Sequence, residues 1–130
     1  MKNMVRIRVH RTISTLCDFL DDKSSIWMEL NIEWSDRFIC LYRNTNNTYV
    51  LIWEDGFHFI DKNSSVFYYY ESILEVETRE QKSVVNRLTI IFKNHERINV
   101  QIDGERGKFK DVFAFQRFFM RVIEDYNEQS

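Results

Sequence analysis

The hydrophobic pattern of the chain changes period near Asp111, and this change constrains the fold more than any other feature. From residue 26 up to Asp111, short runs alternate apolar and polar residues, as strands with one buried face do. Through residues 112–126 apolar residues recur at helical spacing, and Asp111 is a favourable N-cap for that helix. The pattern predicts a mainly β (α+β) fold, an antiparallel bent sheet or partly open β-barrel closed by a C-terminal α-helix.

The expected strands are short and separated by turn residues, which is typical of an antiparallel sandwich or barrel. Asp55-Gly56 is the strongest hairpin signal, because this dipeptide supplies the positive φ angles of a type I′ turn. A second hairpin is expected to turn at residues 94–96. The expected strands cover residues 26–34, 37–43, 48–54, 57–60, 66–70, 74–78, 87–93 and 97–102.

The stretch "SSVFYYYESILEVE" crowds four aromatic residues into positions 67–70 and then interrupts its own alternation. On a strand, Phe67 and Tyr69 face one way while Tyr68 and Tyr70 face the other, so both faces have aromatic surface to bury. A bulge at Ser72-Ile73 would then turn the chain into the next strand. The alternative is functional: Tyr68 and Tyr70 would be displayed for a partner.

The first 25 residues are expected to form a strand and a helix. Residues 5–9 alternate apolar with basic side chains, which predicts a short half-exposed strand. Residues 12–20 carry apolar residues at helical spacing, with Thr12 or Ser14 available as the cap.

The chain has no proline and three glycines, so composition gives no sign of a linker between domains. We therefore expect a single domain over residues 1–130, with an N-terminal extension (1–25) and a core (26–130). Arginines interrupt the start of the chain and no window is apolar enough for a membrane-spanning helix, so we expect a cytoplasmic protein. Two cysteines, Cys17 and Cys40, are too few for a disulfide framework and are expected as small buried side chains.

Four segments between residues 49 and 126 follow one another in an order seen in a known superfamily. They are the hairpin "YVLIWEDGFHFI", the segment "VFYYYESILEVE", the hairpin "RLTIIFKNHERINVQI" and the helix "DVFAFQRFFMRVI". In this order they resemble the pleckstrin-homology-like (PH/GRAM-like) superfamily. The resemblance implies a bent, partly open barrel closed by the last helix, and it does not extend to residues 1–25. In these families an aromatic residue, an acidic residue and then Ile often precede a strand that begins near a Val. In this chain the segment is Tyr70-Glu71-Ser72-Ile73, so Ser72 is an extra residue.

Little in the sequence indicates catalysis. None of His10, His58 and His95 stands at metal-ligand spacing from another histidine or a cysteine pair, so no metal or cofactor is expected. A thiol–imidazole pair of Cys17 with His10 would need the fold to bring them together. We expect a non-enzymatic protein. The formal net charge of −2 also argues against nucleic acid as the partner.

Protein recognition is the function that remains. Phe113 and Met120 stand seven residues apart on the expected last helix, about 60° off its main apolar face. We therefore expect at least one of them to be exposed or covered by another chain, and we take Phe113, Met120, Tyr68 and Tyr70 as candidate partner-binding residues. The partner would be another protein, such as a toxin neutralised by an immunity protein, or a second copy of the chain.

Binding of anionic lipid at a membrane surface is the alternative. Many members of the resembled superfamily bind phosphoinositides through Lys and Arg around the first hairpin. The corresponding loop of this chain offers only Arg43. Lipid binding would therefore have to use basic residues nearer the C-terminus, for which the candidates are Lys93, Arg97 and Lys108.

Overall fold

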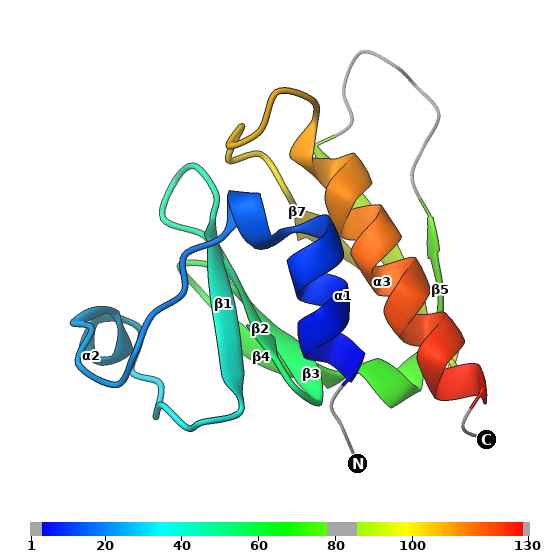
Figure 1. The fold of residues 1–130 in the computed structure, drawn as a ribbon, viewed down its shortest axis with the longest axis horizontal. Helices are drawn as coiled ribbons and strands as arrows, with labels where there is room; N and C mark the ends of the chain where they lie inside the picture. Colours follow the sequence, from blue (N-terminus) through cyan, green and yellow to red (C-terminus); the bar gives the residue numbers. More distant parts are fainter. Residues whose placement is uncertain (1–3, 78–85, 129–130) are drawn as a thin grey trace.

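The computed structural model describes residues 4–77 and 86–128, which form two antiparallel sheets that do not close into a barrel, together with a C-terminal helix (Figure 1). The predicted fold class is confirmed. The first sheet has the order β1 (Phe38–Arg43), β2 (Tyr49–Trp53), β3 (Gly56–Ile60) and β4 (Ser65–Tyr69). The second sheet has the order β5 (Ile73–Glu77), β6 (Arg87–Phe92) and β7 (Arg97–Gln101), and the helix α3 spans Asp111–Glu128.

All expected strands from residue 37 onward are present within a few residues of their expected bounds, and both hairpins are confirmed. Thr78, where the sixth expected strand ended, lies outside the described residues. The described helices include none long and apolar enough to cross a membrane.

The apolar face of α3 forms the centre of the main core. Five of its side chains are essentially inaccessible to solvent: Val112, Phe115, Phe118, Phe119 and Val122. The ring centroid of Phe119 lies 5.0 Å from that of Phe57 on β3 and 5.1 Å from that of Phe118. The helix therefore covers the sheets with the face that its period predicted.

The tyrosine-rich strand is buried mainly on one face. Tyr68 packs on the main core and Tyr70 is 1% exposed, with its hydroxyl donating to the Trp53 carbonyl at 2.8 Å. Phe67 packs on a second apolar cluster, whereas Tyr69 is exposed. The interruption after β4 is a 3₁₀ turn over Tyr70–Ser72, and the register shift follows at Ile73–Glu75 rather than at Ser72-Ile73.

The β2–β3 hairpin turns where Asp55-Gly56 predicted, but not through a type I′ turn. Neither residue has a positive φ angle. Gly56 instead starts β3 opposite Tyr69, and a Cβ at this position would lie 2.2 Å from the Tyr68 carbonyl oxygen and 2.5 Å from the Phe67 ring. The glycine is required by the close approach of β4, not by backbone conformation.

Gly56→Ala is therefore expected to lower the free energy of unfolding by about 1–3 kcal/mol, because the added methyl group overlaps the backbone of β4. Urea denaturation measures this change. Gly107→Ala is the matched control, since its Cβ would first meet the movable end of the Leu16 side chain at 2.9 Å. Equal loss in both variants would contradict the steric explanation.

The expected strand over residues 5–9 is wrong, because this segment is the helix α1 (Met4–Thr12). Val5, Val9 and Ile13 follow one another at intervals of four, and all three are buried in the main core. The helix packs beside α3 (Figure 1), and Arg8 forms two 2.8 Å hydrogen bonds with the Asp125 carboxylate.

The expected helix over residues 12–20 is also wrong. Only a 3₁₀ turn, η1 (Ser14–Leu16), follows α1, and Asp18 then pairs with Leu41 through two backbone hydrogen bonds of 2.8 and 2.9 Å. Thr12 and Ser14 cap no new helix. Their hydroxyls donate to the carbonyls of Arg8 and His10 in α1. The edge of β1 therefore competes successfully for the backbone of this segment.

The expected strand over residues 26–34 is wrong as well, since residues Ile26–Leu30 form the short helix α2. Trp27 packs edge-on against Phe38 at 4.6 Å, and its indole N–H donates to the Asp21 carbonyl at 2.8 Å. This helix covers the second apolar cluster on the outer face of the first sheet, with Trp53 among its members. The alternation of apolar residues here was coincidental, and Met28 projects into solvent.

Candidate binding groove along the last helix

The outer face of α3 exposes the two apolar side chains that its period placed off the core. Phe113 is 46% exposed and Met120 is 45% exposed, whereas Phe119 is inaccessible to solvent. The expectation that at least one of the pair is exposed is confirmed. Phe109, in the loop before the helix, is exposed further, at 85%. Three large apolar side chains therefore follow one another along this side of the molecule.

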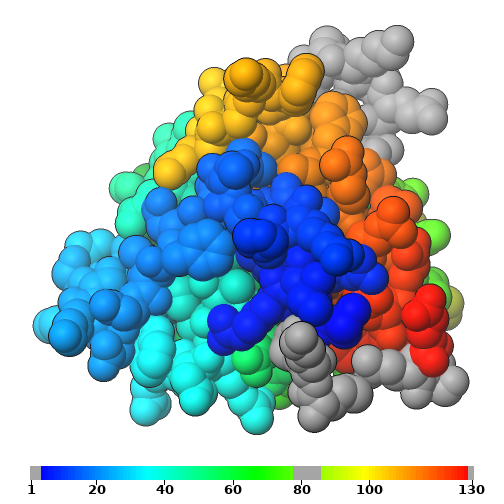
Figure 2. Space-filling view, in the orientation of Figure 1, coloured from blue at the N-terminus to red at the C-terminus, as the bar shows by residue number. Residues whose placement is uncertain are grey.

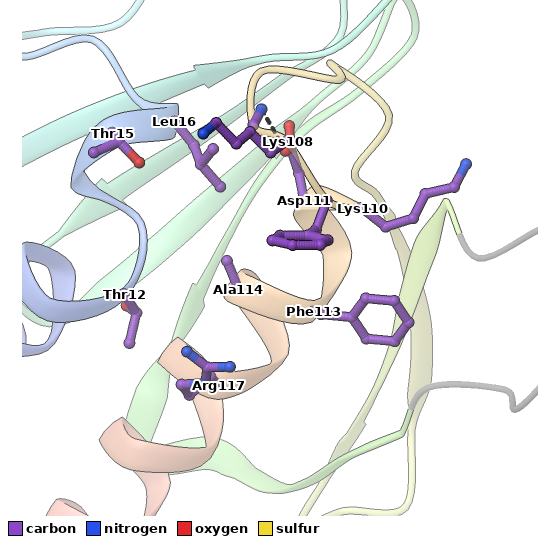
Figure 3. A pocket seen from close by; sticks show the side chains of 11 residues that line it. Thr12, Thr15, Leu16, Lys108, Lys110, Asp111, Phe113, Ala114 and Arg117 are labelled. Atoms are coloured by element: carbon purple, nitrogen blue, oxygen red, sulfur yellow. Dashed lines mark hydrogen bonds between the residues drawn. The ribbon is translucent and has the colours of Figure 1, made fainter.

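A hollow of about 540 Å³ lies between the end of α1, η1 and the first turns of α3. Figure 3 shows Thr12, Thr15 and Leu16 on one side of it, and Lys108, Ala114 and Arg117 on the other. Lys110 and Phe113 lie at the outer rim of the hollow, and their side chains extend away from α1.

A second hollow of about 520 Å³ continues along α3 and shares Phe113 and Arg117 with the first. Met120, Arg121 and Glu124 also line it. We call the two hollows together, with Phe109 at their start, the α3 groove. Figure 2 shows α1 and α3 side by side on the face that carries it.

The loop that forms one wall of the groove is fixed by the carboxylate of Asp111. This buried carboxylate accepts hydrogen bonds from the Arg106 N–H at 2.7 Å, the Gly107 N–H at 2.9 Å and the Tyr42 hydroxyl at 2.7 Å. The Tyr42 hydroxyl in turn accepts from the Gly104 N–H at 2.7 Å. Burial and the Asp111 carboxylate raise the pKa of Tyr42, so its hydroxyl keeps its proton.

Asp111 was expected as an N-cap. It is instead the first residue of α3, and the three hydrogen bonds of its carboxylate tie the preceding loop to β1. It orders the entrance of the groove rather than the first turn of the helix.

The groove is positively charged on its loop side. Within the described part of the chain, Lys108, Lys110 and Arg117 take part in no salt bridge. Neighbouring cations do: Arg106 pairs with Asp18 at 3.3 Å, and Arg121 pairs with Glu124 at 3.2 Å. The three donors to the Asp111 carboxylate are neutral, so this residue keeps its negative charge at the start of the groove.

The tyrosines chosen as partner-binding candidates do not lie in this groove. Tyr70 is buried at 1% exposure, so a partner does not reach it in this structure. Tyr68 is partly buried and stacks on Phe92 at 5.1 Å. Burial raises the pKa of both hydroxyls. The architectural interpretation of the tyrosine run accounts for these two residues.

The three lipid-binding candidates do not lie together. Lys93 follows β6 and Arg97 begins β7, where it pairs with Glu77, so both lie at the turn of this hairpin. Lys108 lines a hollow with Asn86 and Ile102, at the other end of the same hairpin. Six residues of strand, about 17 Å of backbone, separate the two ends.

One shallow hollow brings His58 near Asp55, Ser35 and Ser65, which are residue types used in hydrolysis. The imidazole is not arranged as a general base, however. Its Nδ1 accepts the Trp53 indole N–H at 2.9 Å, so the ring proton of the neutral form is on Nε2 and that nitrogen donates. Burial lowers the pKa of His58, which favours this neutral form.

The two cysteines contact each other. Cys17 forms its hydrogen bond with Cys40, whose pKa is raised first by burial and then by this contact. Cys40 is buried as expected, while Cys17 is partly exposed. No group of three metal-ligating side chains occurs in residues 4–77 and 86–128.

Sequence reasoning identified Phe113 and Met120 as partner-binding candidates and Lys108 as a lipid-binding candidate, but it missed Phe109, Arg117 and the two threonines. Phe109 belongs to no periodic run, and its only signal is an aromatic residue placed between two lysines. Thr12 and Thr15 reach the groove because α1 packs on α3, which the misassigned N-terminal segment concealed. Comparison with protein-family models, with curated proteins and with solved structures finds no match to this chain.

Proposed function

We propose that this chain is a non-enzymatic binding module that acts through protein contacts, with the α3 groove as its binding surface. The observation that carries the proposal is the row of exposed Phe109, Phe113 and Met120 beside cations that form no salt bridge within the described residues. Aromatic residues, Met and Arg are the residue types enriched at protein interfaces.

The specific form that we propose is an immunity protein that neutralises a toxin by covering it. Small size and uneven charge support this form. The PH-like resemblance remains part of the proposal. Its support is the order of four strands, three strands and a C-terminal helix.

Lipid binding at a membrane surface is less well supported. Lys93 and Lys108 lie at opposite ends of the β6–β7 hairpin, about 17 Å of strand apart, so they do not form one concentrated basic patch. Lys108, Lys110 and Arg117 alone would contribute about 3 kcal/mol at an anionic surface. Such binding would be marginal.

The double variant Phe113→Ser/Met120→Ser tests the protein-binding proposal. We expect the free energy of unfolding to change by about 1 kcal/mol or less, because both side chains are half exposed. We expect the affinity for the partner to fall by about 100-fold or more, as loss of two interface anchors does. Titration calorimetry with the toxin that this proposal requires, to be sought among the products of neighbouring genes, measures the affinity, and urea denaturation measures the stability.

Leu74→Ser is the matched control, because Leu74 on β5 is similarly exposed, at 48%, and lies outside the groove. Full binding by the double variant would contradict the proposal, as would unfolding of that variant. Co-sedimentation with phosphatidylserine vesicles tests the alternative. Salt-sensitive vesicle binding lost in Lys108→Glu/Arg117→Glu would favour the lipid instead.

A further inference from the structure

A second surface of the same molecule is complementary to the α3 groove. It is formed by the segment that leads into α2 and by the exposed side of that helix: Phe19, Asp21, Asp22, Met28 and Glu29. We call this set the acidic lobe. Phe19 is 58% exposed and Met28 is 88% exposed, so the lobe presents large apolar side chains to solvent.

The charge of the lobe is opposite to that of the groove. Three exposed carboxylates stand against one lysine, Lys23, in residues 19–30. Asp21 accepts a hydrogen bond from the Lys23 backbone N–H at 2.9 Å, and none of the three carboxylates takes part in a salt bridge with the described residues. The lobe is therefore opposite in charge to Lys108, Lys110 and Arg117 of the groove.

The α2 part of the lobe and the loop of the groove lie toward opposite ends of β1, while Phe19 lies nearer the groove, because Asp18 pairs with Leu41. Trp27 of α2 packs against Phe38, where β1 begins, whereas the loop of the groove is tied through Asp111 to Tyr42, near the end of β1. Figure 1 shows α2 and α3 on different sides of this strand. A second molecule can present its lobe to the groove of the first.

Exposed apolar surface is concentrated on these two surfaces. Eight large apolar side chains are exposed among the described residues, and five of them belong to the lobe or the groove: Phe19, Met28, Phe109, Phe113 and Met120. Exposed apolar residues that gather beside matching charge are typical of interfaces.

We propose that the chain self-associates, with the acidic lobe of one copy docked in the α3 groove of the next. The two surfaces differ, so the contact is head-to-tail and generates rings or open chains rather than a two-fold dimer. This inference does not depend on a foreign partner. It goes beyond the proposed function in one respect: because both occupants use one groove, a second copy competes with that partner.

Sedimentation velocity of the purified full chain, between about 5 and 500 μM, tests the proposal. We expect the average mass to rise with concentration and to fall again when the salt is raised from about 0.05 to 0.5 M, because screening weakens the charge match. Lys108→Glu/Arg117→Glu in the groove and Asp22→Lys/Glu29→Lys in the lobe should each weaken association at least about tenfold.

Mixing the two reversed variants should restore association, because the reversed lobe then faces the reversed groove and the two original surfaces also face each other. Lys62→Glu/Lys93→Glu is the control, since it makes the same change in net charge at exposed lysines outside the lobe and the groove. Met28→Ser, which alters no charge, provides a second lobe variant.

Three results would overturn the proposal. A chain that stays monomeric at about 500 μM in low salt has no such contact. Association that neither reversal weakens uses another surface. Reversed variants that keep their melting temperature, lose association and do not recover it on mixing show that the lobe and the groove do not pair. None of these results decides the toxin-binding test, because that test measures the affinity of the α3 groove for a different protein.

Discussion

Phe119→Ala is expected to lower the free energy of unfolding by about 3–5 kcal/mol, a large share of the ~5–15 kcal/mol that holds a domain together. Phe119 is inaccessible to solvent and lies in the centre of the main core, between Phe57 of β3 and Phe118 of its own helix. Truncation removes apolar burial and leaves a cavity that the aromatic neighbours fill only in part. Urea denaturation and the melting temperature measure the loss.

Phe113→Ala makes the same chemical change six residues earlier on α3, where the side chain is half exposed. We expect it to cost about 1 kcal/mol or less. A difference of more than 2 kcal/mol between the two variants is thus the expected result. Equal losses would show that both faces of α3 are core, and the α3 groove would then lose its support as a binding surface.

Asp111→Ala is expected to lower the free energy of unfolding by about 2–4 kcal/mol and to loosen the loop over residues 103–110. The substitution leaves the buried Tyr42 hydroxyl without its acceptor, together with the N–H groups of Arg106 and Gly107. Hydrogen exchange should therefore accelerate at residues 104–107 before it does so in β6.

Asp111→Asn is the graded control for this variant. Oδ2 accepts from Tyr42 and Arg106, while Oδ1 accepts from Gly107, so an amide oxygen at the Oδ2 position keeps two of the three hydrogen bonds. We expect about half the loss of the alanine variant. If Asp111→Ala leaves both stability and exchange unchanged, the carboxylate does not organise the loop.

The sheets and the last helix were predictable from the sequence because local pattern and tertiary position agree there. In α3 the apolar residues recur at helical spacing, and the helix buries that same face. Hairpins such as β6–β7 form between neighbouring segments, so turn residues and alternation are sufficient to indicate them.

The N-terminal helices were missed because their patterns fit two periods. Val5, Ile7 and Val9 alternate as in a strand, while Val5, Val9 and Ile13 repeat every four residues as in a helix. Packing against α3 decides between them, and this contact joins residues more than a hundred positions apart. Ile26–Leu30 is similar, because the strand prediction placed Met28 inward, whereas the helix buries the neighbours Ile26 and Trp27 together and leaves Met28 exposed.

The candidate site was predictable in part for the same reason. Phe113 and Met120 follow from the helical period alone, since they stand off the buried face. Thr12 and Thr15 join them only through the position of α1, and Phe109 through a loop that Asp111 orders. Long-range packing assembled these parts of the groove.

The pairing of α1 with α3 has a consequence for how the protein is made. The partner of Arg8 is Asp125, 117 positions later, and the apolar face of α1 joins the core that α3 completes. During synthesis at about 5–20 residues per second, α1 therefore waits for roughly 6–23 s before its packing surface has been translated. Until then Val5, Val9 and Ile13 remain uncovered by their final neighbours, so the ribosome-bound chain, rather than the folded protein, is the form with the greatest need of a chaperone.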